Sequence, residues 1–228
     1  MNPRSVVLHA AEFVWDILFP AQCVACGVAG EWWCAACREA IEVPSHNRYP
    51  QAPSNLVALL ATGFYHEPKL RRAIQAFKYS GATQLLPSIK KYVTRWHAAQ
   101  IDPLPWAHEQ ALFVQPVPTS PERVRARGYD QASLIADIVI ENSLPGAHKL
   151  DALRRHPQAM AQASLVSHEL RQANVHNTFD LVPGVQLPHS ILLVDDVVTS
   201  GSSLREAARV LTAGGAQTIY GFALALGA

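Results

Sequence analysis

Two adjacent carboxylates followed by a turn rich in hydroxyl groups give this sequence its strongest chemical signal. The segment from Ile191 to Leu204 reads ILLVDDVVTSGSSL. Its four leading apolar residues predict a strand buried on both faces of a parallel sheet, with Asp195 and Asp196 standing where that strand ends. The turn leads into a helix, whose first N–H groups, positive dipole end and neighbouring hydroxyls can surround a phosphate. The residues expected to form this phosphate cradle are Thr199, Ser200, Gly201, Ser202 and Ser203.

Carboxylates do not attract a phosphate, but they accept hydrogen bonds from the hydroxyl groups of a sugar attached to one. The segment therefore predicts a sugar-phosphate site at the carboxyl end of a parallel strand. The structural alternative is a polar helix cap after a buried strand, with Thr199 or Ser202 as the capping residue. That alternative explains one hydroxyl group, but it does not explain two acids and four hydroxyl groups together.

Four cysteines form a second group with a chemical meaning. Cys23, Cys26, Cys34 and Cys37 have the spacing C-x2-C-x7-C-x2-C. Two such pairs can direct four thiolates at one zinc ion, about 2.3 Å from each sulfur, and four protein ligands leave no open position, so the zinc would be structural. The alternatives are two disulfides, which an export signal would normally accompany, or a redox pair, which would be single and lie in a βαβ unit.

The elements that must position these groups follow from the hydrophobic pattern. From Leu56 onward apolar runs alternate with helical patterns, which is typical of an α/β fold with a parallel sheet. The predicted strands are Leu56–Tyr65, Ala111–Val117, Thr178–Val182, Ile191–Asp195 and Thr218–Leu226. The predicted helices are Glu67–Tyr79, Gln84–Ala98, Tyr129–Asn142, Ser167–Asn174 and Ser202–Ala213. Residues 41–55 are rich in Pro, Ser and Asn and are typical of a linker. We therefore expect an N-terminal zinc-binding lobe in residues 1–54 and a second domain in residues 55–228.

The first residues do not resemble an export signal or a membrane span. In residues 5–18, His9, Glu12 and Asp16 interrupt the apolar run, and no small-residue cleavage site follows. No stretch approaches the roughly 20 apolar residues that a membrane span requires. Apolar residues recur at helical spacing instead, which predicts an amphipathic helix. We expect a cytoplasmic protein with no membrane insertion.

Charge is distributed unevenly along the chain. The formal net charge is only +1, which excludes a protein that coats polyanions through its overall charge. Residues 60–95, however, hold seven Lys and Arg against one acid, Glu67, a local balance of +6. Basic side chains interleaved with Phe77, Tyr79, Tyr92 and Trp96 are typical of a groove for single-stranded DNA, although Tyr92 and Trp96, four residues apart, equally suit a core. The expected DNA contacts are Lys78, Lys90 and Lys91.

The order of motifs along the chain resembles the ComF/GntX family. The features that carry the resemblance are the four-cysteine motif, PVPTSPERVRARGYDQA at residues 116–132 and VDDVVTSG at residues 194–201, with FKYSG at residues 77–81 and the segment 153–179. The resemblance covers essentially the whole chain. It implies a type I phosphoribosyltransferase-like parallel sheet flanked by helices, and an association with competence, transformation, DNA uptake or the use of external DNA as a nutrient.

The same resemblance implies roles for individual residues around phosphoribosyl diphosphate (PRPP). Asp195 and Asp196 would hold the ribose hydroxyls, and the turn Thr199–Ser203 would surround the 5′-phosphate. A Mg2+ ion would neutralise the pyrophosphate. The residues expected near that pyrophosphate are Pro118, Thr119, Ser120, Arg123 and Arg127. Arg155 and Gln162 would belong to a lid, and Lys78 with Tyr79 could contact a phosphate or a base.

Three functions remain open at this point. The first is a phosphoribosyltransferase that releases pyrophosphate, with an acceptor that no motif identifies. The second is a DNA-handling protein that keeps the fold to bind PRPP or a related sugar phosphate, and also binds single-stranded DNA. The third is a structural partner of DNA-uptake machinery in which neither site works.

Overall fold

The computed structural model describes residues 20–44, 53–79, 83–156 and 178–227. The expected helices at residues 5–18 and Ser167–Asn174, together with Gln162, lie outside these described residues. Within the described ranges, no helix combines the length and the apolar character needed to cross a membrane.

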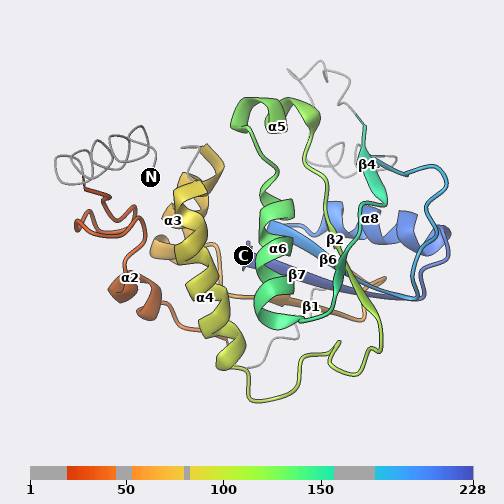
Figure 1. Ribbon diagram of the computed structural model, residues 1–228, viewed down its shortest axis with the longest axis horizontal. Helices are drawn as coiled ribbons and strands as arrows, with labels where there is room; N and C mark the ends of the chain where they lie inside the picture. The colour runs from red at the N-terminus through yellow and green to blue at the C-terminus, as the bar shows by residue number, and fades with distance from the viewer. Residues whose placement is uncertain (1–19, 45–52, 80–82, 157–177, 228) are drawn as a thin grey trace, which may run out of the picture.

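A five-stranded parallel sheet forms the centre of the molecule (Figure 1). Its strands are β1 (Ala58–Ala61), β2 (Leu112–Pro116), β3 (His148–Lys149), β6 (Ser190–Val198) and β7 (Thr218–Leu226). They lie in the order β1-β7-β6-β2-β3, and every neighbouring pair is parallel. The two longest strands, β6 and β7, lie side by side in the middle, so the carboxyl end of β6 has neighbours on both sides.

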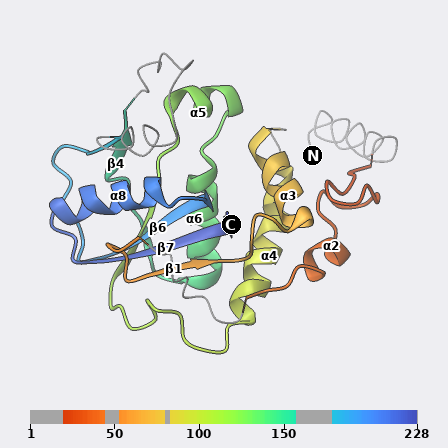
Figure 2. The same cartoon turned by 180° about the vertical axis from the view of Figure 1, so that it is seen from behind.

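Helices cover both faces of this sheet, as the α/β pattern predicts. On one face lie α3 (Pro68–Tyr79), α4 (Leu86–Ala98) and α6 (Gln131–Ser143), and on the other lies α8 (Ser202–Ala213) (Figure 2). A single 3-10 turn, η1 (Thr83–Leu85), leads into α4. Alternate residues of each strand face the two layers: Leu192 and Val194 of β6 pack toward α3, α4 and α6, while Leu193 packs toward α8. This explains why β6 is apolar at every one of these positions.

Some short elements differ from the sequence prediction. The strand expected at Thr178–Val182 is β5 (Phe179–Leu181), but it pairs antiparallel with β4 (Leu153–Arg155) and stays outside the main sheet. Neither β3 nor β4 was expected, because two or three residues are too few to show a period. The segment after β2 also contains a short helix that was not among the predicted ones, α5 (Pro121–Arg127); it begins at a proline and ends at Gly128, whose φ of 84° suits glycine.

The N-terminal lobe shares its core with the rest of the protein. Its short helix α2 (Ala35–Glu39) and the buried side chains of Trp33 and Ile41 belong to the same cluster as α3 and α4. The ring of Trp33 lies 5.0 Å from that of Tyr92 on α4. Arg95 of α4 donates to main-chain carbonyls at the end of α2 and just beyond it. The expectation that a linker separates two cores is therefore wrong, although the division of the chain near residue 54 stays a prediction.

The shared core predicts one cooperative unfolding transition. Trp33→Ala should lower the free energy of unfolding of the whole chain by about 3 kcal/mol or more, since a large buried ring leaves a cavity between the lobe and α4. Urea denaturation followed by circular dichroism and by fluorescence checks this. The matched control is Trp32→Ala, because that neighbouring side chain is 37% exposed and its removal should cost under about 1 kcal/mol. A separate early transition of the lobe would contradict the prediction.

Candidate functional site

A cleft of about 640 Å3 opens beside the carboxyl end of β6. It brings together residues from β6, the turn before α8, the end of α3, the turn after β2, α5 and β4. The sequence-predicted residues that line it are Lys78, Pro118, Thr119, Arg123, Arg127, Arg155, Asp195, Asp196, Thr199 and Ser203. Residues far apart in the chain thus line one cleft. This is expected, because ligands of parallel α/β sheets bind at the carboxyl ends of the strands.

The two carboxylates lie within β6 and not at its end. Pairing with β7 continues past them, through Val197 and Val198 opposite Ala225 and Leu226. The expectation that the strand stops at Asp195 is therefore wrong. Two adjacent acids after an apolar run look like the end of a strand in the sequence, but the main chain of β6 stays paired with β7 beyond them. Both carboxylates line the cleft, but neither residue is fully exposed to solvent.

The two carboxylates differ in how their charge is accommodated. Burial, reinforced by the adjacent negative charge of Asp196, raises the pKa of Asp195 to about 8, while the main-chain N–H of Asp196 and the charge of Lys78 oppose this shift. Asp196 instead forms an ion pair with Lys78, 2.9 Å between Oδ2 and Nζ, with side chains only 15% and 19% exposed. The acidic part of the cleft is therefore less negative than two free carboxylates would make it, because Asp195 keeps its proton to higher pH and Asp196 is paired with a cation.

The residues expected to form the phosphate cradle lie at the start of α8 and in the turn before it. Gly201 occupies the N-cap with φ of 68°, and no side chain caps the helix, so the alternative in which Thr199 or Ser202 is the cap is not what the structure shows. A Cβ on Gly201 would lie 3.2 Å from Pro53, which together with the positive φ explains the glycine. Thr199 and Ser203 line the cleft, while Ser200 donates to the hydroxyl of Ser202 at 3.0 Å beside it.

Three arginines, together called the arginine wall, also line the cleft. Arg123 and Arg127 come from α5, and Arg155 comes from β4. Arg127 donates to Gln131 Oε1 at 2.8 Å, and its guanidinium carbon lies 5.3 Å from the ring centre of Tyr79. Burial, followed by repulsion from Arg123, lowers the pKa of Arg155. Three guanidinium groups on one wall therefore create a positive field in the cleft.

The turn after β2 is held by a carboxylate that sequence reasoning did not assign. Asp130 accepts hydrogen bonds from the N–H groups of Thr119, at 2.9 Å, and Ser133, at 3.3 Å, so it joins the turn to the start of α6. Its position before an apolar helix is a helix N-cap signal that could have identified it. Ser120 is buried at the N-cap position of α5, makes no side-chain cap hydrogen bond there and does not line the cleft. Tyr65, just beyond β1, lines it without having been predicted.

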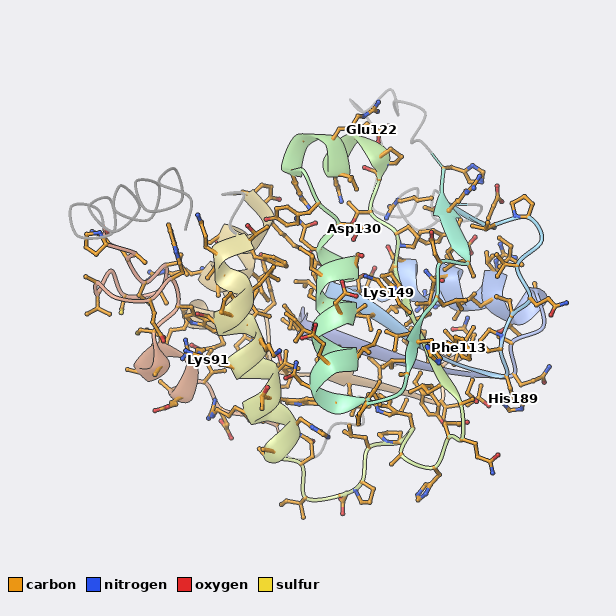
Figure 3. All side chains as sticks on the ribbon, in the orientation of Figure 1. Lys91, Phe113, Glu122, Asp130, Lys149 and His189 are labelled. Carbon is orange, nitrogen blue, oxygen red and sulfur yellow. The ribbon has the colours of Figure 1, made fainter. Side chains whose placement is uncertain are left out.

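The three lysines expected to contact DNA do not lie together. Lys78 is in the cleft, whereas Lys90 and Lys91 lie on α4 and pair with Glu141 at 2.8 Å and with Glu31 at 2.9 Å. Figure 3 labels Lys91, on α4 beside the N-terminal lobe. The expected groove of aromatic rings is also wrong for three of its four members, because Phe77, Tyr92 and Trp96 are at most 1% exposed and belong to the core. Tyr79 alone of the four is exposed, at 76%.

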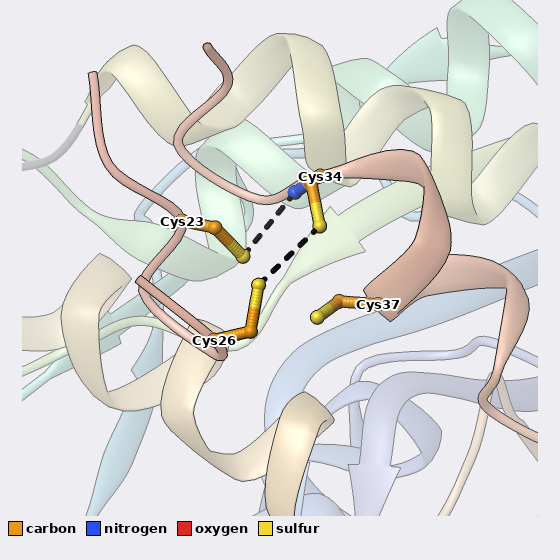
Figure 4. A group of neighbouring side chains, drawn as sticks. All are labelled: Cys23, Cys26, Cys34 and Cys37. Atoms are coloured by element: carbon orange, nitrogen blue, oxygen red, sulfur yellow. Dashed lines mark hydrogen bonds between the residues drawn. The ribbon is translucent and has the colours of Figure 1, made fainter. Parts of the chain in front are cut away.

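The four cysteines converge as a metal site requires (Figure 4). Their sulfur atoms all lie within 4.8 Å of one another, and Cys26 Sγ is 3.7 Å from Cys34 Sγ. Sulfurs about 2.3 Å from a tetrahedral zinc ion are about 3.8 Å apart, so the cluster fits that ion. Burial opposes ionisation of Cys23, but N–H donors led by that of Cys34 outweigh it and lower its pKa to about 6, which favours the thiolate that binds metal.

Comparison with known proteins identifies relatives of two kinds. Over 103 residues the chain is 35% identical to the DNA utilization protein YhgH of Escherichia coli O157:H7, a match that covers 45% of this chain and 44% of that protein. Over 172 residues it is 29% identical to Competence protein F of Haemophilus influenzae, covering 73% and 72%. A 66-residue segment is 33% identical to an orotate phosphoribosyltransferase of Bordetella avium, covering 29% and 30%. No protein-family model matches the chain. The chain thus spans less than half the length of the first and the last of these relatives.

The fold expected from the sequence is confirmed by these findings together. The sheet is parallel and flanked by helices, the cysteine cluster lies in the N-terminal lobe, and a phosphoribosyltransferase is among the relatives. The chemistry that the arrangement can perform is the binding of an anionic sugar: carboxylates for hydroxyl groups, a helix N-terminus for one phosphate and a wall of arginines for another.

Asp195→Asn should change how the stability of the protein depends on pH. A carboxyl with a raised pKa in the folded state keeps its proton longer than in the unfolded chain, so the free energy of unfolding falls as the pH rises from about 4 to about 8. The asparagine variant lacks this charge and should gain at least about 1 kcal/mol relative to the native protein across that range. Urea denaturation at a series of pH values measures the difference, with Asp137→Asn at the surface ion pair with Lys149 as the control. A constant offset between variant and native protein would contradict the assignment.

Proposed function

Because the chain belongs to the ComF family of competence and DNA-utilisation proteins, we propose that it acts in the uptake or use of external DNA and that its cleft binds PRPP or a related sugar phosphate. The names of the relatives support the first part, and the similarity to an orotate phosphoribosyltransferase supports the second. The cluster of four free thiols, which persists in a reducing compartment, supports a cytoplasmic location.

One observation carries the proposal for the cleft: hydroxyl-binding and phosphate-binding groups face the same space at suitable places. Asp195 and Asp196 lie on β6, and the start of α8 with Thr199 and Ser203 follows directly after that strand. A ribose on the carboxylates would therefore carry its 5′-phosphate toward α8. A diphosphate at the other end of the sugar would lie toward the arginine wall.

The charges in the cleft suit this ligand. The lining of the cleft holds four cations, Lys78, Arg123, Arg127 and Arg155, against two acids, Asp195 and Asp196, and Asp196 is already paired to Lys78. The cleft is then positive overall although it contains two acidic residues, and a polyanion enters it with a gain in electrostatic energy. Mg2+ binds phosphate oxygens, so a diphosphate is a suitable ligand for it, and the ion would neutralise the diphosphate charge.

Replacement of both carboxylates tests the sugar-phosphate proposal. Asp195→Asn with Asp196→Asn should weaken PRPP binding at least about tenfold, because the hydrogen bonds that the two carboxyl groups accept from ribose hydroxyls are lost, and the one to the charged Asp196 is itself worth about 1.5–3 kcal/mol. Calorimetric titration with PRPP and Mg2+ measures this. The matched control, Asp137→Asn with Asp180→Asn, removes the same charge from two exposed carboxylates outside the cleft and should leave the affinity unchanged. Equal affinity in the native protein and the cleft variant would refute the assignment.

A second function for the same cleft is phosphoribosyl transfer to a nitrogen base. The 66-residue similarity to an orotate phosphoribosyltransferase favours it. In that reaction the bond between C1 of the ribose and the pyrophosphate oxygen breaks, the base bonds to C1, and pyrophosphate leaves. The chain's own contribution would be to hold the ribose at Asp195 and Asp196 while the arginines hold the leaving group. Pyrophosphate release in the presence of PRPP, Mg2+ and a series of candidate bases separates an enzyme from a binding protein.

Single-stranded DNA remains a proposed partner, together with components of the uptake machinery. The name DNA utilization protein supports this, and the basic stretch of residues 60–95 supplies the cations, although most of them have partners inside the molecule. Components of that machinery are supported by the names of the relatives alone.

A salt series on a labelled oligonucleotide tests the proposed DNA contact. If the surface of α4 binds the phosphate backbone, Lys90→Glu with Lys91→Glu should lower the affinity. The slope of the logarithm of the affinity against the logarithm of the salt concentration should also fall by the equivalent of about two phosphate contacts. Fluorescence anisotropy measures both quantities. Lys149→Glu, which also breaks a surface ion pair but lies on β3, is the control. Absence of binding by the native protein even at about 50 mM salt, where such contacts are strong, would contradict a role in binding DNA.

A further inference from the structure

Helix α3 contacts both chemical centres of the molecule. Near its beginning, Arg72 donates from Nη1 to the carbonyl oxygen of Ala25 at 2.6 Å, and Ala25 lies between Cys23 and Cys26. In its last turn, Lys78 forms the 2.9 Å ion pair with Asp196 in the cleft. At 1.5 Å per residue the two contacts are about 9 Å apart along the helix. In both ribbon views α3 lies between the cysteine-bearing segment and the sheet (Figures 1 and 2).

The helix between these contacts is packed so that it moves as one body. Leu70, Ala73, Ile74 and Phe77 are each at most 1% exposed and belong to the core shared with the lobe. The carbonyl of Phe77 also accepts a hydrogen bond from the hydroxyl of Tyr129. Since a close-packed helix transmits a displacement along its axis, a shift at one end of α3 becomes a shift at the other.

The contact at Ala25 differs from the other contacts of the lobe. Lys91 and Arg95 of α4 also hold the lobe, but they reach Glu31 and the end of α2. Arg72 reaches the tight turn that carries the first cysteine pair, where Gly27 N–H donates to the carbonyl of Cys23 at 2.7 Å. A metal ion shared by the two thiolates would fix the conformation of that turn.

We propose that Arg72 is a positioning residue that couples the cysteine cluster to the cleft through α3. With a metal bound, the turn from Cys23 to Cys26 is fixed, Arg72 anchors α3 to it, and Lys78 is aligned with Asp196. Loss of the metal frees the turn and releases that anchor, so the metal content of the lobe regulates the affinity of the cleft. Coupling of this kind is reciprocal: a ligand in the cleft must retard metal loss by the same free energy. The inference takes its ligand from the proposed function, but part of its test needs no ligand.

The first experiment follows zinc release from the full chain to an excess of a coloured chelator, after elemental analysis has established one zinc per chain. Without any ligand, Lys78→Gln should accelerate release about threefold or more, because the cleft end of α3 is no longer held. The matched control is Lys90→Gln, which breaks a surface pair with Glu141 on α4 and should release zinc at the native rate. Equal rates for Lys78→Gln and the native protein, or protein purified without zinc, would overturn the proposal.

The second experiment repeats the measurement with saturating PRPP and Mg2+. The native protein should release zinc about fivefold more slowly, at the lower end of usual coupling free energies. In Arg72→Gln, the rates of zinc release with and without PRPP should differ by less than about twofold, although this variant still binds PRPP. Arg72→Lys, which keeps a donor for the Ala25 carbonyl, should restore the slower release. Full protection in Arg72→Gln would overturn the proposal. If calorimetry shows no PRPP binding at all, the proposed function fails, and the ligand-free comparison still decides the coupling.

Discussion

Two carboxylates inside a buried parallel strand are the constraint on which the arrangement of the cleft depends. A strand in the middle of the sheet cannot expose both side chains to bulk water, and two adjacent buried charges are costly unless each is neutralised. Asp195 meets this condition by holding a proton, and Asp196 meets it by pairing with Lys78. That pairing determines where α3 must end, because its last turn has to reach the cleft. The arginine wall can then attract an anion without first being neutralised by these acids.

Much of this arrangement could be predicted from the sequence, because β6 and α8 follow one another directly. Local patterns indicate the buried strand, the turn and the helix between Ile191 and Ala213. Because ligands bind at the carboxyl ends of parallel strands, Thr119 and Arg127, which follow another strand, could be expected in the same cleft. The extension of β6 to Val198 was missed, because it depends on pairing with β7 and not on the residues themselves. Arg155 was expected in a lid, but its strand β4 is too short to be recognised before its partner β5 is known.

The basic stretch shows the same dependence on contacts between segments. Its cations suggested an exposed surface for a polyanion, but Arg72 and Arg95 donate to main-chain carbonyls of the lobe. Every residue has a main-chain carbonyl, so the residue types do not show which carbonyl will accept a hydrogen bond. From the sequence, a cation that binds a carbonyl therefore cannot be distinguished from a cation that faces solvent. The same holds for Tyr92 and Trp96, whose spacing suits a core or a groove equally, and whose burial follows from the lobe and the sheet that pack around them. Interactions made between segments, and not within them, are what the sequence alone did not reveal.

The packing of Trp33 against Tyr92 also limits how this protein could have been assembled in evolution. A metal-binding lobe that was merely attached could be exchanged or discarded, leaving an independent catalytic or binding module. Here a chain that began at residue 55 would expose the apolar surface of α4 around Tyr92 and leave the guanidinium of Arg95 without its carbonyl partners. The lobe and the sheet are therefore inherited as a pair: a recombination point between them would produce two fragments, each lacking part of its own interior.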